Sequence, residues 1–175
     1  MDEIHGHASV RVDTTPQAAF DFITDVDRLP EWNAAIEAVL EQPHTLAEGA
    51  EWMVKMHPPR TPSWRSISRI SELDRHRLRF AYRTRNADGN PSYALWAWQV
   101  AQAGDGAQVM VTWDVYLKTL DRRVLAGPLR KRQLAREVPR SLTAMASAIS
   151  HDEVALPGPA GTVRAASKPG QSPRP

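Results

Sequence analysis

The spacing of apolar positions changes twice along the chain, and each change marks a different kind of element. Residues 4–12 alternate between apolar and polar side chains, which predicts a half-buried strand. Thr15-Pro16 then supplies a helix start, because proline is tolerated in the first turn of a helix. Apolar residues recur at helical spacing as far as about Asp25, and Leu29-Pro30-Glu31-Trp32 is expected to turn the chain.

From Ile36 onward the two-residue period returns and continues through six segments that are separated by turn signals. The expected strands cover residues 35–42, 51–57, 63–73, 77–85, 93–102 and 107–117. Connections this short favour an antiparallel meander. Residues 128–150 carry an apolar stripe at helical spacing, and Pro139 is expected to kink this helix without ending it.

Together these elements predict an α+β fold. A curved antiparallel sheet of seven strands is expected to face one long C-terminal helix, with two short helices between the first and second strands. Residues 151–175 hold five of the 14 prolines and no aromatic residue or apolar period. We therefore expect one domain, residues 1–150, and a disordered tail rich in proline, glycine and alanine, residues 151–175.

Composition narrows the possible chemistry. The absence of cysteine excludes disulfides, thiolate zinc sites and iron–sulfur clusters. No apolar run approaches the roughly 18 residues that a membrane span needs. The first residues lack the apolar stretch of a secretory signal, so a cytoplasmic location is expected. A formal net charge of +2 is too small to indicate nucleic-acid binding.

The order of elements, together with the stretch from Phe20 to Asn33, resembles the START/Bet v 1-like (SRPBCC) superfamily. Within it, the closest resemblance is to the polyketide cyclase/dehydrase branch. The cues are Asp25, Pro30 and Trp32, the pair Arg77-Leu78 after Glu72-Leu73-Asp74, and Trp98-Gln99-Val100 before a glycine turn. This resemblance covers residues from about 4 to 150. It implies a helix-grip fold with a cavity for a lipophilic ligand between sheet and helix, and it carries over no catalytic residue.

If the long helix covers one sheet face, the apolar parity of each strand must point toward that helix. Four of the six tryptophans share that parity: Trp52, Trp96, Trp98 and Trp113. They would either pack the core, as large aromatics do at any sheet–helix interface, or line a binding pocket. The residues expected to contact a ligand are Trp52, Met56, Phe80, Tyr82, Trp96, Trp98, Trp113, Val138, Leu142 and Met145.

A meander also alternates the ends at which its connections lie. Connections 57–62, 85–92 and 118–127 should share one end, and the resemblance places the cavity mouth there. The expected rim consists of Arg60, Arg85, Arg122 and Arg123. A basic rim would favour a ligand with an anionic or phenolate-like head, although charged loops also serve solubility.

Candidates for chemistry are few. Tyr82 shares the inward parity and His57 opens the mouth loop, so a cyclase could use them to orient a polyketone and stabilise an enolate. No hydrogen-bonded triad accompanies them. His5 and His7 lie on one strand face, but no third ligand is near, so no metal site and no cofactor are expected.

The sequence therefore predicts a protein that binds a hydrophobic or aromatic small molecule, either polyketide-like or lipid-like. A monomer or homodimer that does not bind nucleic acid is expected. Two alternatives stay open. One is a polyketide cyclase/dehydratase that acts in the same cavity. The other is an interaction module that uses Arg132, Arg136 and Arg140, which fall opposite the apolar stripe of the long helix.

Overall fold

The computed structural model describes residues 3–59, 61–119 and 127–155. Its elements are β1 (Glu3–Val12), α1 (Pro16–Thr24), the 3-10 helix η1 (Val26–Arg28), α2 (Leu29–Trp32), β2 (Ile36–Glu41), β3 (Glu51–Met56), β4 (Trp64–Asp74), β5 (Arg79–Asn86), β6 (Tyr93–Ala103), β7 (Gly106–Tyr116) and α3 (Gly127–Ala155). The predicted order is confirmed, and the six strands of the meander begin and end within two residues of their expected limits.

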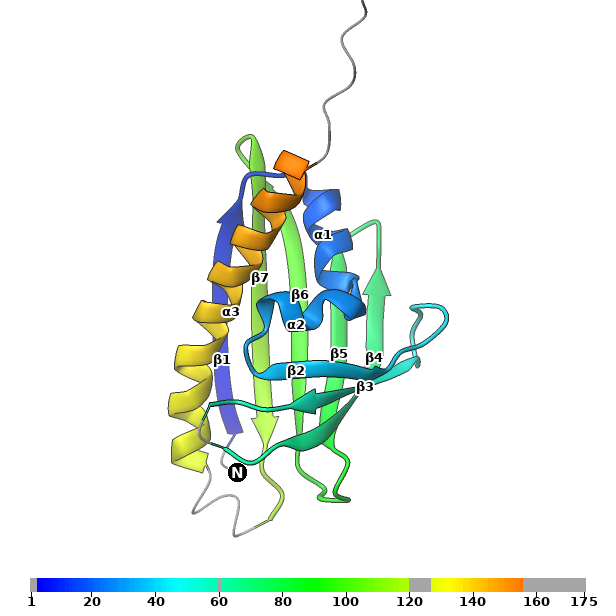
Figure 1. Ribbon diagram of the computed structural model, residues 1–175, viewed down its shortest axis with the longest axis vertical. Helices are drawn as coiled ribbons and strands as arrows, with labels where there is room; N and C mark the ends of the chain where they lie inside the picture. The colour runs from blue at the N-terminus through cyan, green and yellow to red at the C-terminus, as the bar shows by residue number, and fades with distance from the viewer. Residues whose placement is uncertain (1–2, 60, 120–126, 156–175) are drawn as a thin grey trace, which may run out of the picture.

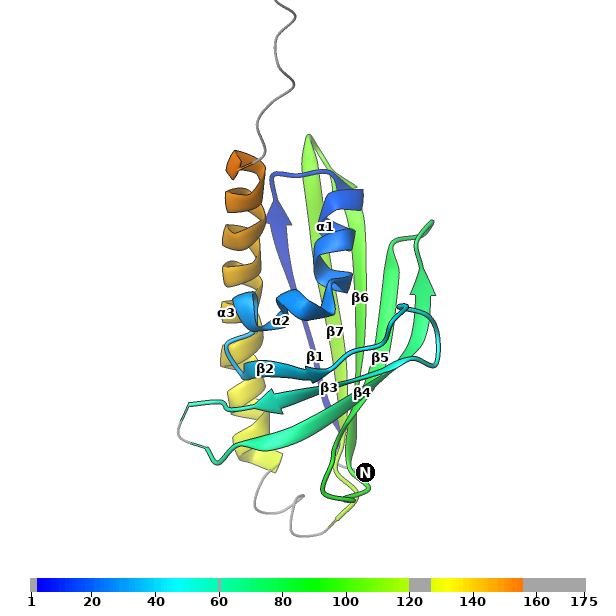
Figure 2. The ribbon, with the colours of Figure 1, turned by 45° about the vertical axis from the view of Figure 1, so that its right-hand side comes forward.

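All seven strands form one antiparallel sheet in the order β1-β7-β6-β5-β4-β3-β2. The sheet curves strongly, so that β2 and β3 run across the concave side of the long strands (Figures 1 and 2). Helix α3 lies along β1 and also contacts α2. The first turns of α3 lie at the same end of the molecule as the β5–β6 connection and the end of β7 (Figure 1).

Helix α1 begins where the sequence predicts. The hydroxyl of Thr15 accepts a hydrogen bond from the backbone N–H of Ala18 at 3.2 Å, and Pro16 occupies the first turn. The helix ends at Thr24, with Asp25 as its C-cap. Its apolar face, which includes the fully buried Phe20, packs against β6 and β7 and fills one end of the groove between sheet and helix.

The predicted parity of β3, β5, β6 and β7 is confirmed by burial. Val109 and Val111 of β7 are at most 1% exposed, whereas Thr112 between Val111 and Trp113 is exposed. Strand β4 differs: before the bulge at residues 70–72, its inward positions place the buried serines Ser66 and Ser68 between Trp64 and Ile70. One face of the sheet therefore supplies the core, but part of that face is small and polar.

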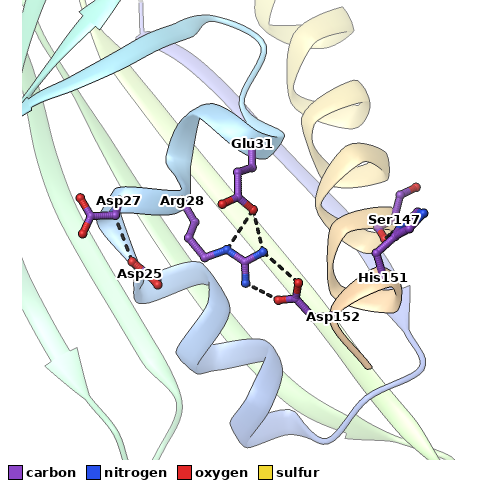
Figure 3. A network of polar contacts seen from close by, with 7 residues as sticks. All are labelled: Asp25, Asp27, Arg28, Glu31, Ser147, His151 and Asp152. Atoms are coloured by element: carbon purple, nitrogen blue, oxygen red, sulfur yellow. Dashed lines mark hydrogen bonds and ion pairs between the residues drawn. The ribbon is translucent and has the colours of Figure 1, made fainter. Parts of the chain in front are cut away.

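Helix α3 continues through Pro139, as predicted, and runs five residues beyond the expected end at Ser150, to Ala155. Its last turn is tied to the start of α2: the Arg28 guanidinium donates hydrogen bonds to both Glu31 and Asp152 (Figure 3). These carboxylates raise the pKa of Arg28, and the same contact lowers the pKa of Asp152. The expected tail beyond Ala155 lies outside the described residues.

Among the described residues, none of the helices is long and apolar enough to cross a membrane.

Candidate functional site

A cavity of about 360 Å³ lies between the concave face of the sheet, α2 and the first half of α3. It exists because several concave positions carry small side chains. Ser66 and Ser68 on β4, and Ala94 on β6, leave space where larger residues would fill the core. The hydroxyls of Ser68 and Thr84 hydrogen-bond each other at 2.8 Å across β4 and β5, so this polar floor is internally satisfied.

The walls of this cavity are aromatic. Five of the six tryptophans line it, together with Tyr82: Trp32, Trp52, Trp64, Trp96 and Trp98. Neighbouring rings meet mostly edge to face. The Trp32 and Trp98 centroids are 5.7 Å apart at an interplanar angle of 80°, and those of Trp52 and Tyr82 are 4.9 Å apart at 69°. Such a wall presents flat apolar faces and ring edges to whatever enters.

The structure separates the ten residues that were expected to contact a ligand into two groups. Six of them line the cavity: Trp52, Met56, Tyr82, Trp96, Trp98 and Val138. Phe80, Leu142 and Met145 are buried core residues outside the cavity wall. Because α1 fills the far end of the groove, side chains that point inward there pack against other side chains and do not border the cavity.

Trp113 is the fourth residue outside the main cavity wall. Its indole lies over Gly6 of β1, so close that a Cβ at Gly6 would be 2.1 Å from Cζ2 of the ring. The missing side chain of Gly6 lets the ring lie flat against β1. There Trp113 lines a separate hollow between β1 and α3, together with Lys131 and Pro139.

The expected mouth residues are only partly described. Arg60, Arg122 and Arg123 lie outside the described residues. Arg85 borders the cavity and is exposed, on the strand position that alternates with the inward Thr84. Nearby, Arg83 stacks on the Tyr93 ring, with the guanidinium carbon 3.8 Å from the ring centroid.

The two candidates for proton transfer differ in position. Tyr82 lines the cavity, and burial raises the pKa of its phenol to about 12 while a hydrogen bond with Trp98 opposes that rise. The phenol therefore stays protonated near neutral pH and can donate a hydrogen bond. His57 is exposed, does not border the cavity, and has Nδ1 3.3 Å from an oxygen of Glu37.

The sequence reading missed three polar residues of α3 that line the cavity: Arg130, Gln133 and Glu137. They lie at i, i+3 and i+7, beside the apolar stripe that was assigned to the core. That spacing places the three side chains on one helix face, whereas the basic surface predicted from the sequence consists of Arg132, Arg136 and Arg140. Those three arginines are exposed, as predicted for the opposite face.

His5 and His7 are exposed, and His5 pairs with Asp114 on the neighbouring strand. Within the described part of the chain, no group of three or more metal-ligating side chains is arranged to hold a metal ion.

Comparison with known proteins gives a consistent picture. The family model described as "Polyketide cyclase / dehydrase and lipid transport" matches residues 3–150. A search of curated proteins finds no significant relative.

Several solved structures share the fold. An aromatase/cyclase, Zhui from Streptomyces sp. R1128, is 19% identical with a TM-score of 0.68, and the match covers 87% of this chain and 96% of that one. Ara h 8.0201 is 14% identical with a TM-score of 0.64, covering 86% and 99%. The di-domain ARO/CYC StfQ from the steffimycin pathway is 12% identical with a TM-score of 0.69, covering 88% of this chain and 52% of that one. These likenesses confirm the predicted helix-grip fold.

Proposed function

Because this chain belongs to the polyketide cyclase/dehydrase and lipid transport family, we propose that it binds an apolar or aromatic small molecule in the cavity beneath α3. The observation that carries the proposal is the aromatic wall around an unfilled space. The volume of about 360 Å³ falls in the range of small-molecule sites, roughly 300–1,000 Å³. A few polar groups among many apolar ones are typical of sites that bind and orient such ligands.

Titration with a neutral fluorescent probe, N-phenyl-1-naphthylamine, tests the proposal. The probe should bind wild-type protein. Ala94→Leu adds bulk at a position that lines the cavity and should weaken probe binding several-fold or more. Ala97→Leu makes the same change on the opposite parity of β6 and should leave binding unchanged. Equal affinities for the two variants would show that the probe binds elsewhere.

A cyclase or dehydratase acting in this cavity is the second candidate, and Tyr82 favours it. A phenol whose pKa is about 12 remains a neutral hydrogen-bond donor within an aromatic cavity. Such a donor can stabilise the enolate that forms when a poly-β-ketone cyclises. Tyr82→Phe should then abolish turnover of a cyclising substrate while N-phenyl-1-naphthylamine still binds. Turnover that survives this substitution would remove Tyr82 from the chemistry.

A further inference from the structure

Three side chains on one face of α3 form a hydrogen-bonded chain in the wall of the cavity. Arg130 donates from Nη1 to Oε1 of Gln133 at 3.2 Å, and Gln133 donates from Nε2 to Oε1 of Glu137 at 2.8 Å. All three residues line the cavity. Arg130 belongs to the first turn of α3, and Glu137 lies about 10 Å farther along the helix axis, at 1.5 Å per residue.

Gln133 fixes the direction of this chain. An amide has one acceptor oxygen and one donor nitrogen, and here the oxygen faces the guanidinium while the nitrogen faces the carboxylate. Turning the amide over would break both bonds at once. The cavity is therefore polarised along α3, with its positive group on the first turn, at the end where the β5–β6 connection lies, and its negative group about two turns farther along the helix (Figure 1).

The guanidinium of Arg130 has more donors than acceptors. It carries five N–H groups, and the described residues provide it with one hydrogen-bond acceptor, Gln133. Burial lowers the pKa of Arg130 and the charge of Glu137 opposes that effect. A half-buried cation with unused donors is unfavourable unless a further acceptor reaches it. The other described arginine at the cavity, Arg85, is exposed, so water can accept hydrogen bonds from its guanidinium.

We propose that Arg130 is the receptor for an anionic group on the bound molecule, with Gln133 holding the guanidinium in place and Glu137 repelling that group from the part of the cavity that lies farther along α3. The ligand is then an amphiphile with an apolar or aromatic body and one carboxylate-like or phenolate-like end. Its anionic end then lies beside the first turn of α3, and its apolar body lies against the aromatic wall. This inference rests on the proposed function, since it assigns the orientation and charge of a ligand in the same cavity.

Two probes that share one ring system test it. N-phenyl-1-naphthylamine is neutral, and 8-anilino-1-naphthalenesulfonate carries the same rings with one anionic group. Arg130→Gln keeps a polar side chain without the charge, and should weaken binding of the sulfonate about tenfold or more, the usual weight of a charge-assisted hydrogen bond. Affinity for the neutral probe should change less than about twofold. Arg132→Gln, on the exposed face of the same helix, is the matched control and should change neither affinity.

Two further variants keep the test decisive. Arg130→Lys retains the charge without the planar fork and should bind the sulfonate with intermediate affinity. Glu137→Gln should strengthen sulfonate binding several-fold by removing the like charge. Equal ratios of the two affinities in wild-type protein and Arg130→Gln would overturn the role of Arg130 while leaving the proposed function standing. A wild-type protein that binds neither probe would overturn both proposals.

Discussion

Gly6 should be intolerant of even one additional methyl group. It lies in the ordinary extended backbone of β1, which alanine can adopt, so backbone strain plays no part. The obstacle is Trp113 on the paired strand β7. A Cβ at position 6 would be 2.1 Å from Cζ2, 2.2 Å from Cε2 and 2.7 Å from Nε1 of the indole. Non-bonded carbons normally approach to about 3.5–4.0 Å, so Gly6→Ala forces the ring to move by more than 1 Å.

The ring has little room to move. Trp113 is 6% exposed and its centroid is 5.8 Å from that of Trp96, which lines the cavity. Overpacking of this kind destabilises proteins by about 1–3 kcal/mol. For a chain of this length each kcal/mol lowers the melting temperature by about 2–4 °C, so Gly6→Ala should lower it by roughly 2–12 °C. Because the displaced ring presses on Trp96, affinity for N-phenyl-1-naphthylamine should fall as well.

A double-mutant cycle isolates the clash. Thermal unfolding is measured for wild type, Gly6→Ala, Trp113→Leu and the double variant. In the Trp113→Leu background the alanine should be neutral or stabilising, because glycine within a strand is less favourable than alanine by about 0.5–1 kcal/mol. The same loss of stability in both backgrounds would refute the reasoning, and so would a Gly6→Ala protein that melts like wild type.

Two further predictions concern titration and the end of α3. Tyr82 should ionise only near pH 12 in an ultraviolet absorbance titration, and Tyr82→Phe should remove that step; a Tyr82 step near pH 10 would contradict its burial. Because folding raises this pKa above the ordinary value of 10.0, the corresponding stability is complete below pH 10 and is lost as the pH rises toward 12. Arg28→Gln should speed hydrogen exchange in the last turn of α3 with little change elsewhere. Asp152 has a lowered pKa, so in wild type this protection should persist at neutral pH and fade as the pH falls below the ordinary value of 3.8. A protection factor, the measured rate corrected for intrinsic exchange, that stays the same across that pH range would count against the tie.

The fold was predictable because its strands carry a clear two-residue period. On β7 every second residue from Val109 to Val115 is apolar, and the structure buries each of them. Such a pattern fixes the buried face of a strand whatever surrounds it. Strand β4 lacks this pattern, because Ser66 and Ser68 occupy inward positions while Ile67 lies on the outward side. In the sequence, serines at alternating positions indicate the solvent-facing side of a strand. The structure instead buries these two serines against the cavity.

The cavity itself was harder to predict than the fold. Parity identifies residues that face inward, but it does not say which of them meet empty space. Phe80 and Met145 face inward and are fully packed, because α1 occupies their end of the groove. Trp32 lines the cavity from α2, where no strand parity applies. Which residues border the cavity depends on the side-chain volumes of several elements together. The pattern of a single strand does not contain that information.

The pairing of β1 with β7 has a consequence for how this protein is made. Glu3 lies opposite Tyr116, so 113 residues separate a strand from its hydrogen-bonded neighbour. At about 5–20 residues per second, a ribosome needs roughly 5–21 s to proceed from the end of β1 at Val12 to the end of β7 at Tyr116. During that time a strand with one apolar face has no partner in the sheet, and unpaired strands of this kind can associate with other chains. Because β1 pairs with no strand other than β7, the first strand to be synthesised is among the last to join the sheet.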